Sequence, residues 1–196
     1  MGTDTRPQAP FHYRLFSFID ETCAELPIAH YLYLIVSTSR DRNHWCFWIV
    51  LGHAAASWFM AGMIWTIHVV HYPLFAYVGA DSYQSFQARH VDLIGRLLLV
   101  PWGIEGLTAL GLVFLLTGKE KKLAVMGALL MLAIIALSAF ASAPAHEQLA
   151  DGFDFDIHQD LMAANFVRAL LWTARAALST GILYLCYPFE ARKVSN

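Results

Sequence analysis

Histidine is the residue type of this chain best placed to do chemistry beside its apolar segments. A neutral imidazole can act as a general base, or it can bind zinc, copper or iron. His68 and His71 are three residues apart, so one helix face can present both as candidate bases. The candidate metal ligands lie beside the ends of apolar segments and are His71, His90, His146 and His158. Their spacing matches no HExxH motif, so imidazoles that only form hydrogen bonds remain the alternative.

Three charged residues lie well inside apolar segments, where an ionisable group is costly and marks a candidate functional site. Counted from the segment ends, Glu105 and Arg175 lie at nearly the same depth, which predicts a buried ion pair. Such a pair could fix helix packing or serve a ligand, and both interpretations stay open. Asn165 and Trp172 lie three and four residues from Arg168, so these side chains share one side of a helix.

Positive charge exceeds negative charge among these inner residues. Arg96 lies near the start of the second apolar segment, at a level comparable with Arg168. The excess favours an anionic or strongly polarised ligand such as an enolate, a phenolate or a carboxylate. The candidate ligand-binding residues are therefore Arg96, Glu105, Trp172 and Arg175. In the alternative, Arg96 and Arg168 only extend to the membrane surface.

Four long apolar segments must position these residues. The chain has 196 residues, of which 58% are hydrophobic and 14% charged, whereas a soluble domain carries about 25% charged residues. The segments cover residues 45–72, 97–117, 123–143 and 161–187. Because about 20 helical residues cross a bilayer core, the sequence predicts an all-α integral membrane four-helix bundle. The net charge of −2 and the absence of a basic run exclude nucleic acid as a partner.

The distribution of basic residues predicts how the chain lies in the membrane. Residues 1–44 form a cytoplasmic or interfacial segment, residues 45–187 the membrane domain and residues 188–196 a cytoplasmic tail. Basic residues gather in both terminal segments and in residues 118–122, while the other two loops are mostly acidic. This asymmetry predicts that both termini are cytoplasmic. We expect a multi-pass protein of the bacterial inner membrane.

The two halves of the membrane domain look alike. In the first half, a helix ends near His71 and the next begins near Arg96; in the second half, His146 and Arg168 take these places. This weak internal repeat predicts two helix pairs related by a pseudo-twofold axis along the membrane normal. A site on that axis would draw on both halves.

Two stretches of the second half carry a family resemblance. They read APAHEQLA over residues 143–150 and ANFVRA over residues 164–169. Together they resemble the second half of a family of small four-helix membrane proteins that includes the fungal anthrone oxygenases. Asn165 and Arg168 match the Asn-x-x-Arg of its last helix. The resemblance covers roughly residues 50–187 and implies oxygenation of an anthrone-like ring.

Three functions are compatible with these residues. The first is a membrane oxidoreductase or oxygenase that acts on a hydrophobic, aromatic small molecule. In it, His68 or His71 removes a proton, Asn165 and Arg168 stabilise the enolate, and dioxygen reacts with or without a metal. The second is a non-catalytic subunit of a membrane complex that binds iron, copper, zinc or haem. The third is a small-anion transporter. Membrane lipid is an expected partner throughout, and a homo-oligomer is compatible with each function.

Overall fold

The computed structural model describes the backbone of residues 27–186 and the side chains of residues 45–186. Most of the predicted N-terminal segment and all of the predicted tail at residues 188–196 lie outside these ranges. The chain divides into two compact units, Met1–Trp45 and Cys46–Asn196. Every side-chain relationship discussed below lies within the second unit.

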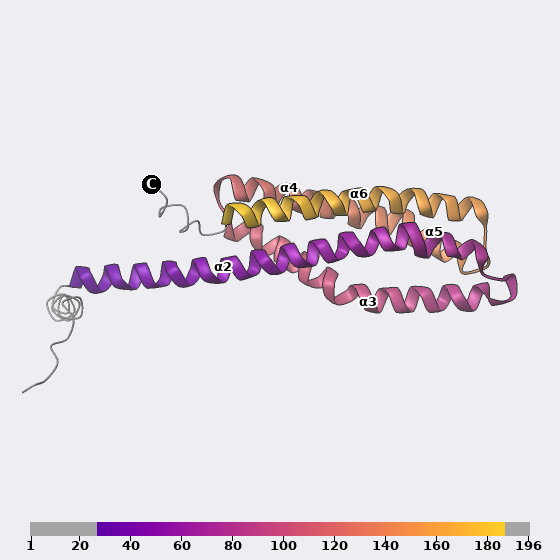
Figure 1. Ribbon diagram of the computed structural model, residues 1–196, viewed down its shortest axis with the longest axis horizontal. Coiled ribbons are helices and arrows are strands. Elements are labelled where there is room, and N and C mark those ends of the chain that lie inside the picture. Colours follow the sequence, from indigo (N-terminus) through magenta and orange to yellow (C-terminus); the bar gives the residue numbers. More distant parts are fainter. Residues whose placement is uncertain (1–26, 187–196) are drawn as a thin grey trace, which may run out of the picture. The chain divides into compact units, whose positions relative to one another are not determined.

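Helix is the only regular structure in the described part of the chain (Figure 1). The first half contains α2, a π-helical turn η1, a 3-10 turn η2 and then α3. The second half contains α4, a π-helical turn η3, a short helix α5 and then α6. The bounds are α2 Pro27–Thr66, η1 Ile67–His71, η2 Tyr72–Tyr77, α3 Ala80–Leu115, α4 Gly118–Leu137, η3 Ser138–Ser142, α5 Ala143–Leu149 and α6 Phe155–Cys186.

Four helical stretches are long and apolar enough to cross a membrane. They are Trp45–Tyr77, Ala80–Leu115, Gly118–Leu149 and Phe155–Cys186. The predicted all-α membrane four-helix bundle is therefore confirmed, and the chain is an integral multi-pass protein. The sidedness of the termini and the bacterial inner membrane stay predictions.

The helices are longer than the apolar segments from which they were predicted. α3 has 36 residues and α6 has 32. At 1.5 Å per residue these helices are about 54 Å and 48 Å long, whereas the hydrocarbon core is about 30 Å thick. Apolar composition marks only the part inside the bilayer, so the predicted starts at residues 97 and 161 were too late. The polar stretches before them continue the same helices.

Both halves carry the same irregularity. The π-helical turn Ile67–His71 is followed by Pro73, and the π-helical turn Ser138–Ser142 is followed by Pro144. Proline has no backbone N–H and cannot continue the α-helical bond pattern, which is one cause of such local changes. After each proline, the chain turns into a long helix, α3 or α6. This correspondence supports the predicted repeat of two helix pairs.

The core runs along the inner face of α6. α6 packs most extensively against α4, which also contacts α3, and α4 and α6 lie side by side in Figure 1. The middle of the bundle is closed by Met60, Ile64, Met131, Ile134 and Trp172. A second apolar cluster closes the end where η2, α5 and the first turns of α3 and α6 meet, which we call the histidine end. It contains Tyr72, Phe75, Tyr83, Leu149 and Leu161.

Candidate functional site

Three of the predicted histidines meet at the histidine end. His71 of η1 and His90 of α3 form a hydrogen bond of 2.7 Å between Nε2 and Nδ1. The ring centroid of His146, from α5, lies 5.2 Å from that of His90. Residues far apart in sequence thus form one imidazole cluster, which contains three of the five histidines predicted at this boundary.

The tautomer of His146 is set by two neighbours. The Gln87 amide nitrogen donates to His146 Nδ1 at 2.9 Å and also lies 3.3 Å from the His146 carbonyl oxygen. Because Nδ1 accepts, a neutral His146 carries its proton on Nε2. That nitrogen donates to the Tyr72 hydroxyl at 2.9 Å. Both ring nitrogens of His146 are therefore engaged.

His158 is held by the backbone of η2. Its Nε2–H donates to the Tyr72 carbonyl oxygen at 2.8 Å, while its Nδ1 is buried without a partner among the described residues. The ring of Phe75 stands between the histidines, with its centroid 6.0 Å from His158 and 5.0 Å from His90. His158 thus lies beside the imidazole cluster, and its hydrogen bond to Tyr72 fixes the turn at Pro73.

The four predicted metal ligands, His71, His90, His146 and His158, do not form a metal-binding site. Within residues 45–186, no group of three or more His, Cys, Asp or Glu side chains is placed to hold a metal ion. The reason is visible in the contacts, because His146 uses both nitrogens and His158 Nε2 is bound to a carbonyl. The predicted metal ligands are brought near one another but not into a coordination set, so we derive no step through a metal or haem.

His68 does not share the face of His71, contrary to the sequence prediction. Its ring packs 5.4 Å from Phe166 and 5.9 Å from Trp65 on the side of α6. The two histidines lie within η1, and a π-helical turn contains more residues than an α-helical one. In a π-helix, three residues therefore fall further short of a full turn than in an α-helix. The side chains of His68 and His71 consequently point in more widely separated directions. His71 remains a candidate base, and His68 lies outside the cluster.

A groove opens beside the histidine pair. It has a volume of about 640 Å³, and His71 and His90 are part of its wall. The rest of the wall is mainly the outer side of α3 and consists of Val78, Ser82, Ser85, Phe86, Arg89, Leu93, Ile94 and Leu97. This size is typical of sites that bind small molecules. His90 Nε2 is buried and has no partner in the described part of the chain.

The predicted residues of α6 lie behind the histidines in the bundle interior. Arg168 donates from one terminal nitrogen to Ser142 Oγ at 3.1 Å and interacts with the Tyr72 hydroxyl. Asn165 and Trp172 are fully buried. Both polar atoms of the Asn165 amide, Trp172 Nε1 and Arg168 Nε lack partners among the described residues. An unpaired buried polar group costs about 1–3 kcal/mol, so each calls for a water or ligand partner.

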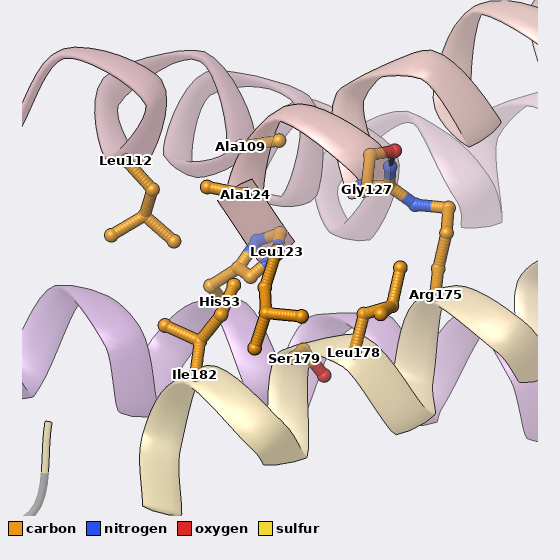
Figure 2. Close-up of a pocket in the computed structure, with 10 residues that line it drawn as sticks. All are labelled: His53, Ala109, Leu112, Leu123, Ala124, Gly127, Arg175, Leu178, Ser179 and Ile182. Atoms are coloured by element: carbon orange, nitrogen blue, oxygen red, sulfur yellow. Dashed lines mark hydrogen bonds between the residues drawn. The ribbon is translucent and has the colours of Figure 1, made fainter. Parts of the chain in front are cut away.

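Glu105 and Arg175 form the predicted ion pair in the middle of the bundle, and both are buried. Ser57 of α2 donates to the same Glu105 oxygen at 3.1 Å, and Arg175 also donates to the Gly127 carbonyl oxygen of α4. Figure 2 shows Arg175 reaching from α6 to Gly127 beside a cavity of about 10 Å³ that His53 also lines. This volume suits one water molecule, so the cavity is not a substrate site.

Arg96 lies apart from the other predicted ligand residues. It is exposed on α3 and pairs with Asp92 one turn away at 2.8 Å. The structure therefore does not bring Arg96 and Arg168 together, because Arg96 lies on the outer face of a helix that begins well before it.

Sequence reasoning missed two residues that organise the site. Tyr72 contacts His146, His158 and Arg168 through its hydroxyl and carbonyl groups. Gln87 fixes the His146 tautomer. Their positions in the sequence could have indicated a role in the site, since Tyr72 is next to His71 and Gln87 lies one helical turn before His90.

Comparison with known proteins identifies no relative of this chain. The chain matches no protein-family model, no curated protein and no solved structure. A function must therefore be argued from the chemistry of the site.

Proposed function

We propose that this protein is a membrane oxidoreductase of the oxygenase class, acting on a hydrophobic aromatic molecule with an acidic C–H bond. The observation that carries the proposal is the hydrogen-bonded pair His71–His90, which lines a groove of about 640 Å³. The resemblance of residues 143–150 and 164–169 to the anthrone oxygenase family motivates the reaction class. The metal-binding subunit and the anion transporter stay predictions without a specific supporting contact.

A hydrogen-bonded pair of neutral imidazoles offers both a base and a donor. The two rings have four nitrogens and two protons, and one proton lies between His71 Nε2 and His90 Nδ1. The second proton is on one of the two outer nitrogens, His71 Nδ1 or His90 Nε2. Because His90 Nε2 is buried, the nitrogen that can meet a ligand in the groove is His71 Nδ1, whose free lone pair can accept a proton from carbon when His90 carries the second proton. In the other tautomer, the N–H of His71 Nδ1 can donate to a substrate oxygen.

The proposed reaction converts a ring CH₂ group and dioxygen into a ketone and water. The imidazole removes one C–H proton, and the resulting carbanion is stabilised as an enolate. Dioxygen accepts the carbanion's electrons by forming a C–O bond, and the protonated imidazole returns its proton to give a hydroperoxide. Removal of the second C–H proton then forms the C=O bond and breaks the O–O bond, releasing hydroxide. The protonated base neutralises that hydroxide to water.

Arg168 and Asn165, in the bundle interior, lie behind the histidine pair at which the negative charge of the enolate develops. Arg168 and Asn165 supply donors without partners of their own in the described structure. Arg168 interacts with Tyr72, which accepts a hydrogen bond from His146 in contact with His90. Neither Arg168 nor Asn165 is part of the groove wall, so we assign the proton transfer to the His71–His90 pair. Arg168 acts on that pair only as a positioning residue, through Tyr72 and His146.

The proposal is tested with purified protein in phosphatidylcholine nanodiscs, with anthrone as the probe and isotopically labelled dioxygen. We expect anthraquinone in which the new carbonyl oxygen carries the label, at a rate well above that of empty nanodiscs. His90→Gln should lose this activity, while His53→Gln, a histidine outside the groove wall, should retain it. Rates equal to those of empty nanodiscs for the unaltered protein would refute the proposal for this ring system.

A further inference from the structure

The groove beside His71 and His90 changes in polarity along α3. The polar lining residues Ser82, Ser85 and Arg89 all belong to its first part, together with Val78 and Phe86, whereas its last part is lined only by Leu93, Ile94 and Leu97. Over these residues α3 rises by about 22 Å, so the groove suits an elongated molecule. The histidine pair lies between the polar and the aliphatic parts.

The polar part can hold an oxygen-bearing or anionic group. Arg89 is exposed and forms no ion pair within the described part of the chain, since Asp92 is engaged by Arg96. Next to it, His90 Nε2 has no partner among the described residues. His90 Nε2 is buried, so the exposed guanidinium of Arg89 is the group that complements a hydroxyl, a phenolate or a carbonyl on a ring.

The aliphatic part continues into the surface that faces lipid. Leu97 is exposed, and the same helix continues with the exposed residues Leu99, Val100, Ile104 and Leu107. A tail that leaves the groove at Leu97 can therefore continue along these apolar side chains, beside the exposed Asp92–Arg96 pair. This continuity distinguishes the groove from a closed pocket for a compact ring.

From this gradient we infer that the ligand is a ring-headed lipid: an oxygen-bearing ring that carries the acidic CH₂ group of the proposed reaction and one long aliphatic tail. The ring lies at His71 and His90 with its oxygen toward Arg89, and the tail lies along Leu93 and Leu97. This inference rests on the proposed function, because both place the reacting ring at the same histidine pair. It adds that the substrate is drawn from the bilayer with its tail still in the membrane.

Affinity alone cannot test the tail. Lipid chains are as apolar as leucine, so moving a tail from the bilayer into the groove gains little free energy. The position of the tail is the informative quantity. We therefore choose 4-octylphenol with a photoreactive diazirine, placed either at the tail end or on the ring, and the full chain in phosphatidylcholine nanodiscs.

The expected result is position-dependent labelling. The tail-end probe should label α3 around Leu97, and the ring probe should label the segment around Phe86 and His90. Leu93→Trp should fill the groove and reduce both by about tenfold, which is the order of effect that overpacking produces. Leu107→Trp, an exposed leucine outside the groove wall, should leave both unchanged.

A different pattern would overturn the inference. Tail-end labelling spread evenly over the exposed faces of α3 and α4, and unaffected by Leu93→Trp, would mean that the tail only dissolves in lipid. Labelling needs no turnover, so retained groove labelling with no anthrone oxidation refutes the oxygenase and keeps the ring-headed lipid. Anthrone oxidation with evenly spread labelling refutes only the lipid tail. A normal thermal unfolding curve for each variant shows that it is folded.

Discussion

Glu105 of α3 and Arg175 of α6 form a buried ion pair to which all four membrane helices contribute. Ser57 of α2 donates to the carboxylate, and the Gly127 carbonyl of α4 accepts from the guanidinium. The Arg175 guanidinium carbon also lies 5.6 Å from the centroid of the Trp172 ring. In a bilayer, unpaired charges at this position would be costly, so the pair sets how the helices meet below the histidine end.

Arg175→Met should destabilise the bundle strongly, because it leaves Glu105 buried without its cation. The expected loss is about 3–5 kcal/mol of the free energy of unfolding, the usual result of breaking a buried pair. Adding Glu105→Gln should recover part of it, since the uncompensated charge is removed. The measurement is reversible unfolding in mixed micelles. Arg96→Met is the matched control, since its exposed pair with Asp92 contributes about 0–1 kcal/mol; equal losses for the two variants would contradict a structural role for the buried pair.

The two histidines of η1 should differ in their effect on anthrone oxidation. His71→Gln should lose the activity, because His71 is hydrogen-bonded to His90 and lines the groove. His68→Gln should retain at least half of it, since His68 packs against Trp65 and Phe166 outside the groove wall. Oxygen consumption in nanodiscs measures both. Loss in His68→Gln with normal activity in His71→Gln would reverse the assignment of the base.

Gln87 should control the tautomer of His146. Its amide nitrogen donates to His146 Nδ1, which places the ring proton on Nε2 toward Tyr72. In Gln87→Leu we expect a mixture of tautomers and about tenfold slower anthrone oxidation, corresponding to one lost hydrogen bond. Nitrogen NMR of histidine-labelled protein reads the tautomer directly. An unchanged His146 spectrum in Gln87→Leu would show that the Tyr72 contact alone is sufficient.

Asn165 should contribute to activity at the expense of stability. Asn165→Val removes two buried polar atoms that have no described partner, so the free energy of unfolding should stay the same or rise. Anthrone oxidation should fall by about tenfold, equivalent to about 1.4 kcal/mol on the barrier, because Asn165 lies outside the groove wall and acts only by positioning its neighbours. Leu161→Ala, a fully buried residue of the same helix, should instead lose about 2–5 kcal/mol and so calibrates the unfolding assay. A destabilised but active Asn165→Val would assign Asn165 to packing.

The sequence was sufficient for features that depend on depth and composition. Four apolar segments predict the bundle, and equal depth predicts the ion pair of Glu105 and Arg175. It also predicts that His68, His71, His90, His146 and His158 lie at one boundary, and three of these, His71, His90 and His146, lie close together.

The remaining features depend on local backbone geometry and on tertiary contacts. The π-helical turn that separates His68 from His71 has no clear signature except the proline after it. The roles of Tyr72 and Gln87 arise only when α3, α5 and η2 pack together. For the same reason, apolar composition could not show that Arg96 lies on the outer face of a helix that begins at Ala80.

The central claim is that the His71–His90 pair removes a proton from a ring carbon in the groove. It is tested most directly by hydrogen–deuterium exchange at the CH₂ group of anthrone, without dioxygen, in nanodiscs prepared in deuterated water. We predict exchange faster than in empty nanodiscs for the unaltered protein and for His53→Gln, with the acceleration lost in His71→Gln and His90→Gln. Exchange at the rate of empty nanodiscs in the unaltered protein, or acceleration that survives both substitutions, would contradict the claim.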